Sequence, residues 1–256
     1  MDPHISTALD RQLTPDARHW LTDAVARVGQ DPTAVRAVFP AVGRRCGRGP
    51  LLADGTDGVG GVDGTGRAGA LGWTVADAVR VRLLETLPLR GAALAEEISG
   101  LHRHGDAAEQ RAVLRSLAHL ERVDPSLAAL VLPLVHAALR SNDTGLIEAA
   151  LGPYAARHLD DDGYRNAVLK CVFCEIPLHR VAGLAERADR ELARMLADFA
   201  HERVAAGRAV PADIWPIVRA HPGTLEASGL PAETDSPSPD RRAAAEQALA
   251  AYTGAA

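Results

Sequence analysis

The sequence has few aromatic residues and one lysine, and the shortage of aromatics argues against a protein built from sheets. Aromatic side chains make up 4% of the 256 residues, and the 47% apolar fraction comes mostly from Ala, Leu and Val. Ala and Leu suit close-packed helices, whereas sheets favour Ile, Tyr and Phe. The composition therefore predicts an all-α protein. The formal net charge is -5 and no basic block is present, so we expect no nucleic-acid partner.

Cysteines and long apolar runs are also scarce. Three cysteines in a chain of this length do not form a disulfide framework, which indicates a reducing compartment. The N-terminus, with Asp2 and Pro3, has no apolar region typical of a secretory signal. No apolar run approaches the roughly 20 residues that a transmembrane helix needs. We therefore expect a soluble, cytoplasmic protein without a transmembrane segment.

Helix-start signals recur along the first part of the chain. Thr14 followed by Pro15 predicts a helix to about residue 28, and Asp31 followed by Pro32 predicts a second one. Together they predict an N-terminal helical hairpin over residues 1–46.

Residues 47–72 are rich in Gly and Asp and predict a disordered loop. The segment 64–69 matches G-x-G-x-x-G, but a dinucleotide turn needs a strand before it and an acid on a second strand after it. Neither is recognisable. The aspartates of the loop also lack the alternating spacing of a calcium-binding loop. A solvated linker is the favoured interpretation.

From Trp73 onward, helix signals start about every 17 residues and are joined by short loops. Thr74 and Asp106 are predicted N-caps, and helices are expected to about residues 87, 104, 123 and 139. This spacing predicts a main helical domain over 73–222, built as an irregular HEAT-like or alpha-solenoid stack of antiparallel helices. Residues 223–256 predict a flexible tail with a possible short helix over 241–252.

Residues 160–218 hold the most informative polar side chains. Acids at 160–162 precede a helix expected to about Ile176 that is apolar around most of its circumference, so Asn166 and Lys170 stand out on it. A long helix is expected over 186–206. Glu202 follows its apolar stripe, and we hypothesise that it turns inward to meet Lys170 or Arg165 in a buried polar cluster with Asn166. The alternative is that Glu202 and Lys170 simply extend to solvent.

Two cysteines on the same helix raise the question of a metal. Cys171 and Cys174 are spaced C-x-x-C, but a zinc site needs a second pair of ligands. Small core residues are the favoured interpretation. A mixed site with His158, His179 and the acids at 160–162 stays open, although we expect no metal and no cofactor.

Several runs between residues 165 and 208 resemble the EboA family. They are Arg165-Asn166-Ala-Val-Leu-Lys170-Cys171-Val-Phe, Ile176-Pro177-Leu, Arg180-Val-Ala-Gly-Leu184, Glu191-Leu-Ala-Arg194-Met-Leu and Ala200-His201-Glu202-Arg203-x-Ala-Ala-Gly-Arg208. The resemblance covers residues 160–218. It implies a product of an ebo gene cluster that takes part in making or moving a secondary metabolite. It defines no catalytic residue.

Two hypotheses about function follow. In the first, the chain is a non-catalytic helical adaptor that holds other ebo-cluster proteins or a small anionic metabolite. The candidate binding residues are Arg165, Asn166, Lys170, Arg180 and Glu202. In the second, it is an enzyme that uses His201 and Glu202 as acid and base on a phosphorylated or cyclitol-like substrate. An enclosed pocket around these side chains would favour the enzyme, and an open groove the adaptor. No nucleophile with its base is recognisable, so we favour the adaptor.

Overall fold

The computed structural model describes residues 1–52 and 72–254, and in these ranges every regular element is a helix. The all-α prediction is confirmed, whereas the HEAT-like arrangement stays a prediction. Most of the predicted loop over 47–72 lies outside the described residues. The two sides of that gap are joined by an isolated antiparallel bridge between Pro50 and Thr74. The chain divides into two compact units, Met1–His158 and Leu159–Ala256, and this boundary falls inside the predicted main domain.

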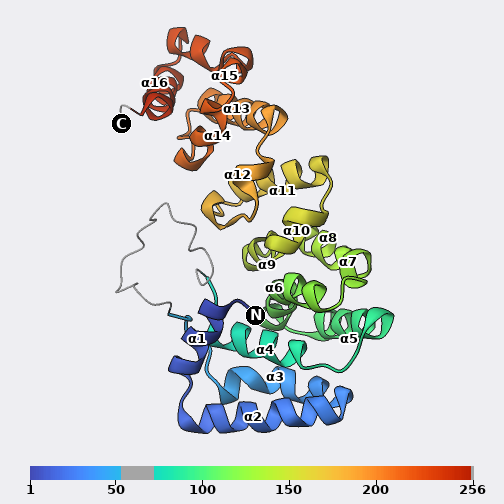
Figure 1. Ribbon diagram of the computed structural model, residues 1–256. Coiled ribbons are helices and arrows are strands. Elements are labelled where there is room, and N and C mark those ends of the chain that lie inside the picture. The colour runs from blue at the N-terminus through green and yellow to red at the C-terminus, as the bar shows by residue number, and fades with distance from the viewer. Residues whose placement is uncertain (53–71, 255–256) are drawn as a thin grey trace. The chain divides into compact units, whose positions relative to one another are not determined.

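The described part of the first unit consists of helices that follow one another along the chain (Figure 1). In chain order they are α1 (Pro3–Gln12), α2 (Pro15–Gln30), the 3₁₀ helix η1 (Pro32–Ala34), α3 (Val35–Arg45), α4 (Val75–Glu85), α5 (Gly91–His104), α6 (Ala107–Val123), α7 (Leu127–Leu130), α8 (Leu132–Arg140), α9 (Thr144–Ala150) and α10 (Pro153–His158).

Two of the N-caps expected in the first unit, Thr14 and Asp106, are confirmed. The Thr14 and Asp106 side chains accept hydrogen bonds from Ala17 N and Glu109 N. The helix predicted to run to residue 139 is divided into α7 and α8, because Pro133 has no N–H to donate to the preceding turn.

Helix α4 forms the centre of the first unit and packs against α1, α2, α3 and α6. It carries Asp77, which is fully buried and closes a reciprocal capping box with Thr74. Two arginines of α6 neutralise this carboxylate. Arg115 Nη1 lies 2.6 Å from Asp77 Oδ2, and Arg111 Nη2 lies 3.2 Å from Oδ1. A buried charge is tolerated only when it is paired in this way.

The second unit begins with α11 (Figure 1). Its helices are α11 (Asp161–Phe173), η2 (Leu178–Arg180), α12 (Leu184–Arg187), α13 (Arg190–Ala205), η3 (Ala212–Ile214), α14 (Trp215–Arg219), α15 (Gly223–Ser228), η4 (Leu230–Asp235) and α16 (Pro239–Thr253). The helix expected over 186–206 is interrupted, because Ala188 and Asp189 are extended and Asp189 caps α13 anew.

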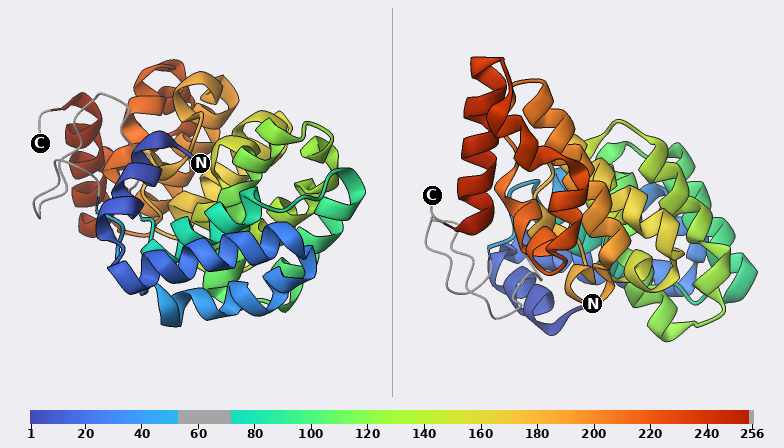
Figure 2. Two further views of the ribbon diagram at one scale, coloured as in Figure 1. Left: turned by 60° about the horizontal axis from the view of Figure 1, so that its bottom comes forward. Right: turned by 90° about the horizontal axis from the view of Figure 1, so that it is seen from above.

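Residues 223–254, for which the sequence predicts a flexible tail, form α15, η4 and α16 in the structure. Two further views show α16 beside the helices that precede it, and it packs on α13, α14 and η4 (Figure 2). The ring of Tyr252 meets that of buried Trp215 edge-on with centroids 5.8 Å apart, and Arg219 donates to the Tyr252 carbonyl. The Ala-rich helix therefore has the partner surface that it needs.

No helix in the part of the chain that the structure describes is long and apolar enough to span a bilayer.

Candidate functional site

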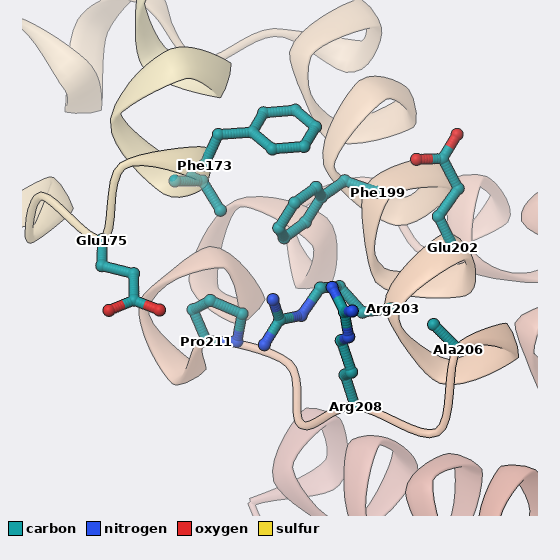
Figure 3. A pocket seen from close by; sticks show the side chains of 9 residues that line it. Phe173, Glu175, Phe199, Glu202, Arg203, Ala206, Arg208 and Pro211 are labelled. Carbon is teal, nitrogen blue, oxygen red and sulfur yellow. The ribbon is translucent and has the colours of Figure 1, made fainter. Parts of the chain in front are cut away.

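A hollow of about 310 Å³ lies where the C-terminal ends of α11 and α13 meet in the second unit (Figure 3). We call it the α11–α13 hollow. A second hollow of about 330 Å³ adjoins it and shares Val172, Glu175, Arg203 and Pro211 with it. Each is at the lower end of the size range of small-molecule sites. The α11–α13 hollow is lined by Val172, Phe173, Glu175, Phe199, Glu202, Arg203, Ala206, Arg208 and Pro211.

One wall of the α11–α13 hollow is aromatic. Phe173, the last residue of α11, is 60% exposed, while Phe199 of α13 is buried. Their rings meet edge-to-face with centroids 4.8 Å apart, as Figure 3 shows. Burial of a large apolar side chain away from water usually stabilises a protein. The exposed Phe173 ring therefore offers apolar surface to a ligand in the hollow.

Two guanidinium groups, Arg203 and Arg208, lie below the Phe199 ring in Figure 3. After α13 ends, Gly207 adopts a left-handed φ of 66°, Gly207 N donates to Val204 O and Arg208 N donates to Arg203 O. This is the glycine-terminated turn that commonly ends helices. It brings Arg208 back beside Arg203, whose Nε donates to Ala209 O at 2.9 Å. Arg203 and Arg208 are not among the binding residues predicted from the sequence, although Gly207 after a helix is a usable signal for this turn.

Glu175 occupies the same kind of turn at the end of α11, but without a glycine. Its φ is 56°, and no other non-glycine residue in the described ranges has a positive φ. Ile176 N donates to Cys171 O at 2.9 Å, which fixes the left-handed conformation. An L-residue with a side chain is strained there. Glu175 lines both adjoining hollows, so its strained backbone places a carboxylate at their junction.

Replacing Glu175 by glycine should stabilise the protein. We expect Glu175→Gly to raise the free energy of unfolding by about 1 kcal/mol, because glycine adopts the left-handed region without a steric penalty. Chemical denaturation followed by circular dichroism measures this. Gly207→Ala is the matched control, and it should be destabilising because a Cβ there is strained and 3.3 Å from Asp240 Cβ. An unchanged or lower stability of Glu175→Gly would show that the turn is not strained.

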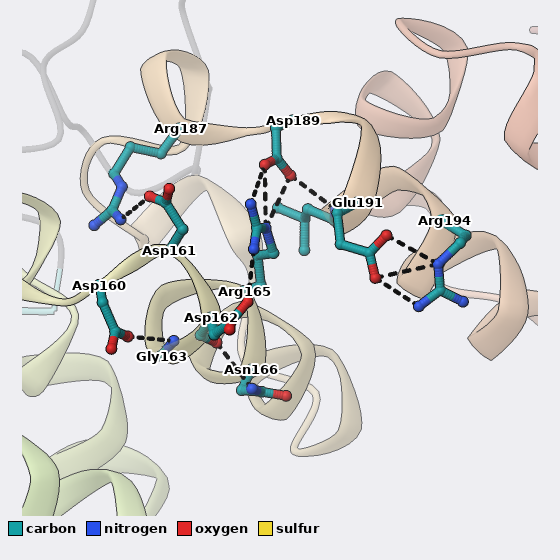
Figure 4. A network of polar contacts seen from close by, with 11 residues as sticks. Asp160, Asp161, Asp162, Gly163, Arg165, Asn166, Arg187, Asp189, Glu191 and Arg194 are labelled. Atoms are coloured by element: carbon teal, nitrogen blue, oxygen red, sulfur yellow. Dashed lines mark hydrogen bonds and ion pairs between the residues drawn. The ribbon is translucent and has the colours of Figure 1, made fainter.

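Arg165, a predicted binding residue, forms hydrogen bonds with two aspartates, one on its own helix and one at the start of α13 (Figure 4). Its Nε and Nη2 donate to Asp189 Oδ2 at 3.1 and 2.5 Å, and Nη1 donates to Asp162 at 2.7 Å. The hydrogen bonds to Asp189 raise the pKa of Arg165, and the same bonds hold the pKa of Asp189 below its usual value. Arg165 therefore ties α11 to the N-terminus of α13.

Asp189 has two separable contributions to stability. It also accepts from Leu192 N as the N-cap of α13. Asparagine caps as well as aspartate but carries no charge, so Asp189→Asn should lower the free energy of unfolding by about 1 kcal/mol and Asp189→Ala by about 2 kcal/mol, given that the pair is partly exposed.

The charge contribution of Asp189 should also depend on pH. The pKa of Asp189 is lower in the folded state than in the unfolded state. The stabilisation by its charge is therefore fully present above the unfolded pKa of about 3.9 and is lost as pH falls through the folded pKa. Denaturation of the wild type and Asp189→Asn between about pH 7 and 3 tests this. A gap between the two that does not narrow below about pH 4 would contradict it.

The buried polar cluster predicted around Glu202 is wrong in its burial, because Asn166 and Glu202 are both exposed. Asn166 donates to Asp162 O at 2.8 Å, and Glu202 lines the α11–α13 hollow. Helical periodicity predicts that Glu202 faces inward, because it follows Met195 of the apolar stripe by two turns, but Met195 is itself only half-buried. Lys170 is half-buried, and Arg180 in η2 is exposed.

His201 and Glu202 face different neighbours. His201 Nε2 lies 3.1 Å from Glu233 Oε1 in η4, and Arg241 Nε lies 2.7 Å from Glu233 Oε2. The hydrogen bond from Arg241, and then that from His201, lower the pKa of Glu233. Consecutive residues of a helix are rotated by about 100° from each other. The structure therefore does not bring the proposed acid and base to one point.

Of the two cysteines, Cys171 is buried in the core and Cys174 is half-buried. His158 pairs with Glu121 within the first unit, and His179 is exposed in the second. Within residues 1–52 and 72–254, no group of three or more His, Cys, Asp or Glu side chains could hold a metal ion.

The fold and the hollow together define an all-helical protein with an open, amphipathic depression on its second unit. The chain belongs to the EboA family: the family model described as "Metabolite traffic protein EboA" matches residues 1–219. The match extends well beyond the segment 160–218 that carries the resemblance in the sequence, and it ends with α14. Comparisons with curated proteins and with solved structures gave no match.

Proposed function

We propose that this chain is a non-catalytic accessory protein of an ebo-type metabolite pathway and that it holds a small anionic metabolite in the α11–α13 hollow. The observation that carries the proposal is the pairing of an exposed aromatic wall, Phe173, with two guanidinium groups, Arg203 and Arg208. The family description as a metabolite traffic protein supports a helper role.

The chemistry of the lining indicates an amphipathic ligand. Arginine binds carboxylates and phosphates through its planar fork of donors. The Phe173 ring would stack on a flat or apolar part of the same molecule. Glu202 and Glu175 also line the hollow and would accept hydrogen bonds from hydroxyl or amino groups. Of the binding residues predicted from sequence, Glu202 is the one that lines this hollow. Asn166, Lys170 and Arg180 stay candidates for an outer contact, whereas Arg165 is engaged by Asp189.

An acid–base role for His201 and Glu202 has less support, because His201 is directed at Glu233. The hollow is open rather than enclosed around both side chains, which is the arrangement that favours a binding protein over an enzyme.

Isolation of the full-length chain from its native host, followed by solvent extraction and mass spectrometry, tests the proposal. We expect one anionic, partly apolar compound at near-stoichiometric amounts. Phe173→Ala removes an exposed ring without opening the core and should reduce its recovery by about tenfold.

Leu52→Ala serves as the control, because Leu52 is an equally exposed apolar residue of the first unit. It should leave recovery unchanged. Recovery of stoichiometric pathway proteins with no small molecule would contradict metabolite binding and favour an adaptor between enzymes.

A further inference from the structure

A separate hollow of about 570 Å³ lies in the first unit, between α3 and α5. We call it the α3–α5 hollow. Its volume is within the range of small-molecule sites. Its polar lining includes Arg36, Glu96, Glu97, Gly100, Arg103 and Glu109, the last from the first turn of α6. The proposed metabolite site lies in the other unit and has no residue in common with it.

Gly100 leaves part of the α5 backbone bare in this hollow. It lies inside the helix, where glycine is less stable than alanine. A Cβ added there would meet nothing within 4 Å, so packing does not require the glycine. A bare helix surface permits the close approach of another molecule.

Glu109 places a nearly buried carboxylate in the α3–α5 hollow. It is 9% exposed, and Arg80 Nη2 lies 3.5 Å from Oε1. Among the residues that the structure describes, none donates a hydrogen bond to this carboxylate, although a carboxylate can accept about four. Gly105 makes room for it, since a Cβ there would lie 3.0 Å from Oε2.

The lining of the α3–α5 hollow carries three carboxylates and two guanidinium groups, from Glu96, Glu97, Glu109, Arg36 and Arg103. Burial, and next the neighbouring Asp106, raise the pKa of Glu109, whereas Arg80 and Arg44 act to lower it. Arg36, which also lines the hollow, is already bonded to Glu97, with Nε and Nη2 at 2.9 and 2.6 Å from the two carboxylate oxygens. A ligand that carries a positive charge and hydrogen-bond donors would pair with the Glu109 carboxylate and fill its unused acceptor positions.

A metal ion does not fit these requirements. The described residues contain no group of three or more His, Cys, Asp or Glu that could hold one. The hollow is also far larger than a single ion, whereas an organic molecule could occupy it.

We propose that the α3–α5 hollow is a second binding site, specific for a small organic ammonium compound. The ammonium group donates to the Glu109 carboxylate, and the carbon body of the ligand lies on the bare backbone at Gly100. Ser99 and Glu96 are available for additional polar groups of the ligand.

Calorimetric titration of the full-length protein with putrescine and spermidine tests this site. We expect saturable binding of at least one amine below about 10 mM and none of the diol analogue of putrescine. Gly100→Leu should fill the hollow and weaken binding by about tenfold while raising thermal stability. Glu109→Gln should weaken binding to a similar extent.

Gly29→Leu is the matched control, because Gly29 is also inside a helix with nothing within 4 Å of an added Cβ. It should raise stability and leave amine binding unchanged. The proposal is overturned if neither amine binds, if the diol binds equally well, if Gly100→Leu binds as the wild type does, or if Mg²⁺ competes with the amine. None of these results bears on the α11–α13 hollow, so the two proposals fail independently.

Discussion

Asp77→Ala should lower the free energy of unfolding by about 3–5 kcal/mol, which is the usual cost of breaking a buried ion pair from one side. The variant would leave Arg111 and Arg115 without their carboxylate in the interior of the first unit. It would also remove half of the capping box that starts α4. Because α4 packs against four other helices, the loss should extend through the unit.

Chemical denaturation gives the total loss, and hydrogen exchange of the α4 and α6 amides assigns it to the first unit. Asp77→Asn keeps an acceptor for Thr74 and should cost less than Asp77→Ala. The control is Asp10→Ala, which breaks the exposed pair with Arg82 and should cost less than about 1 kcal/mol. Equal losses for Asp77→Ala and Asp10→Ala would mean that the buried network contributes nothing beyond a surface pair.

The double variant Arg203→Ala with Arg208→Ala should bind an aromatic anion at least about 100-fold more weakly than the wild type, because each charge-assisted hydrogen bond contributes about 1.5–3 kcal/mol. Anilinonaphthalene sulfonate is a suitable probe, since it combines an aromatic body with one anionic group. Fluorescence titration measures its affinity. Arg208 is exposed, and Arg203 contributes one backbone contact to the fold, so the folded state should persist.

Arg190→Ala is the matched control, because Arg190 is an exposed arginine at the other end of α13 that does not line the hollow. It should bind the probe as the wild type does. Since this dye also binds partly folded states, the circular dichroism spectra of all variants must coincide. Unchanged affinity of the double variant would remove the two arginines from the proposed site.

The helix boundaries were largely predictable because their signals are local. An N-cap such as Thr14 or Asp106 bonds to a backbone N–H only three residues away, so neighbouring residues contain the information. Asp189 is also an N-cap with a local signal. The helix-forming residues before it, however, predict one continuous helix over 186–206. The folding of residues 223–254 into packed helices had no local signal, because α16 depends on contacts with Trp215 and Arg219.

The polar residues of the second unit were recognised as unusual, but their partners were not predictable. Arg165 reaches Asp189, which lies 24 residues away, and this pairing exists only because α11 packs on α13. Burial of Glu202 was expected from periodicity, which gives the direction of a side chain around its helix and not whether another element covers it there.

From the amino-acid sequence alone one can predict that the chain is helical, where most helices begin, and which segment resembles the EboA family. These properties follow from composition, capping and short-range spacing. The packing of the helices places Phe173 in the same hollow as Arg203 and Arg208, buries Asp77 beside two arginines of another helix, and leaves the second hollow next to Gly100. Such arrangements join residues that are distant in the chain, and packing of whole helices decides them.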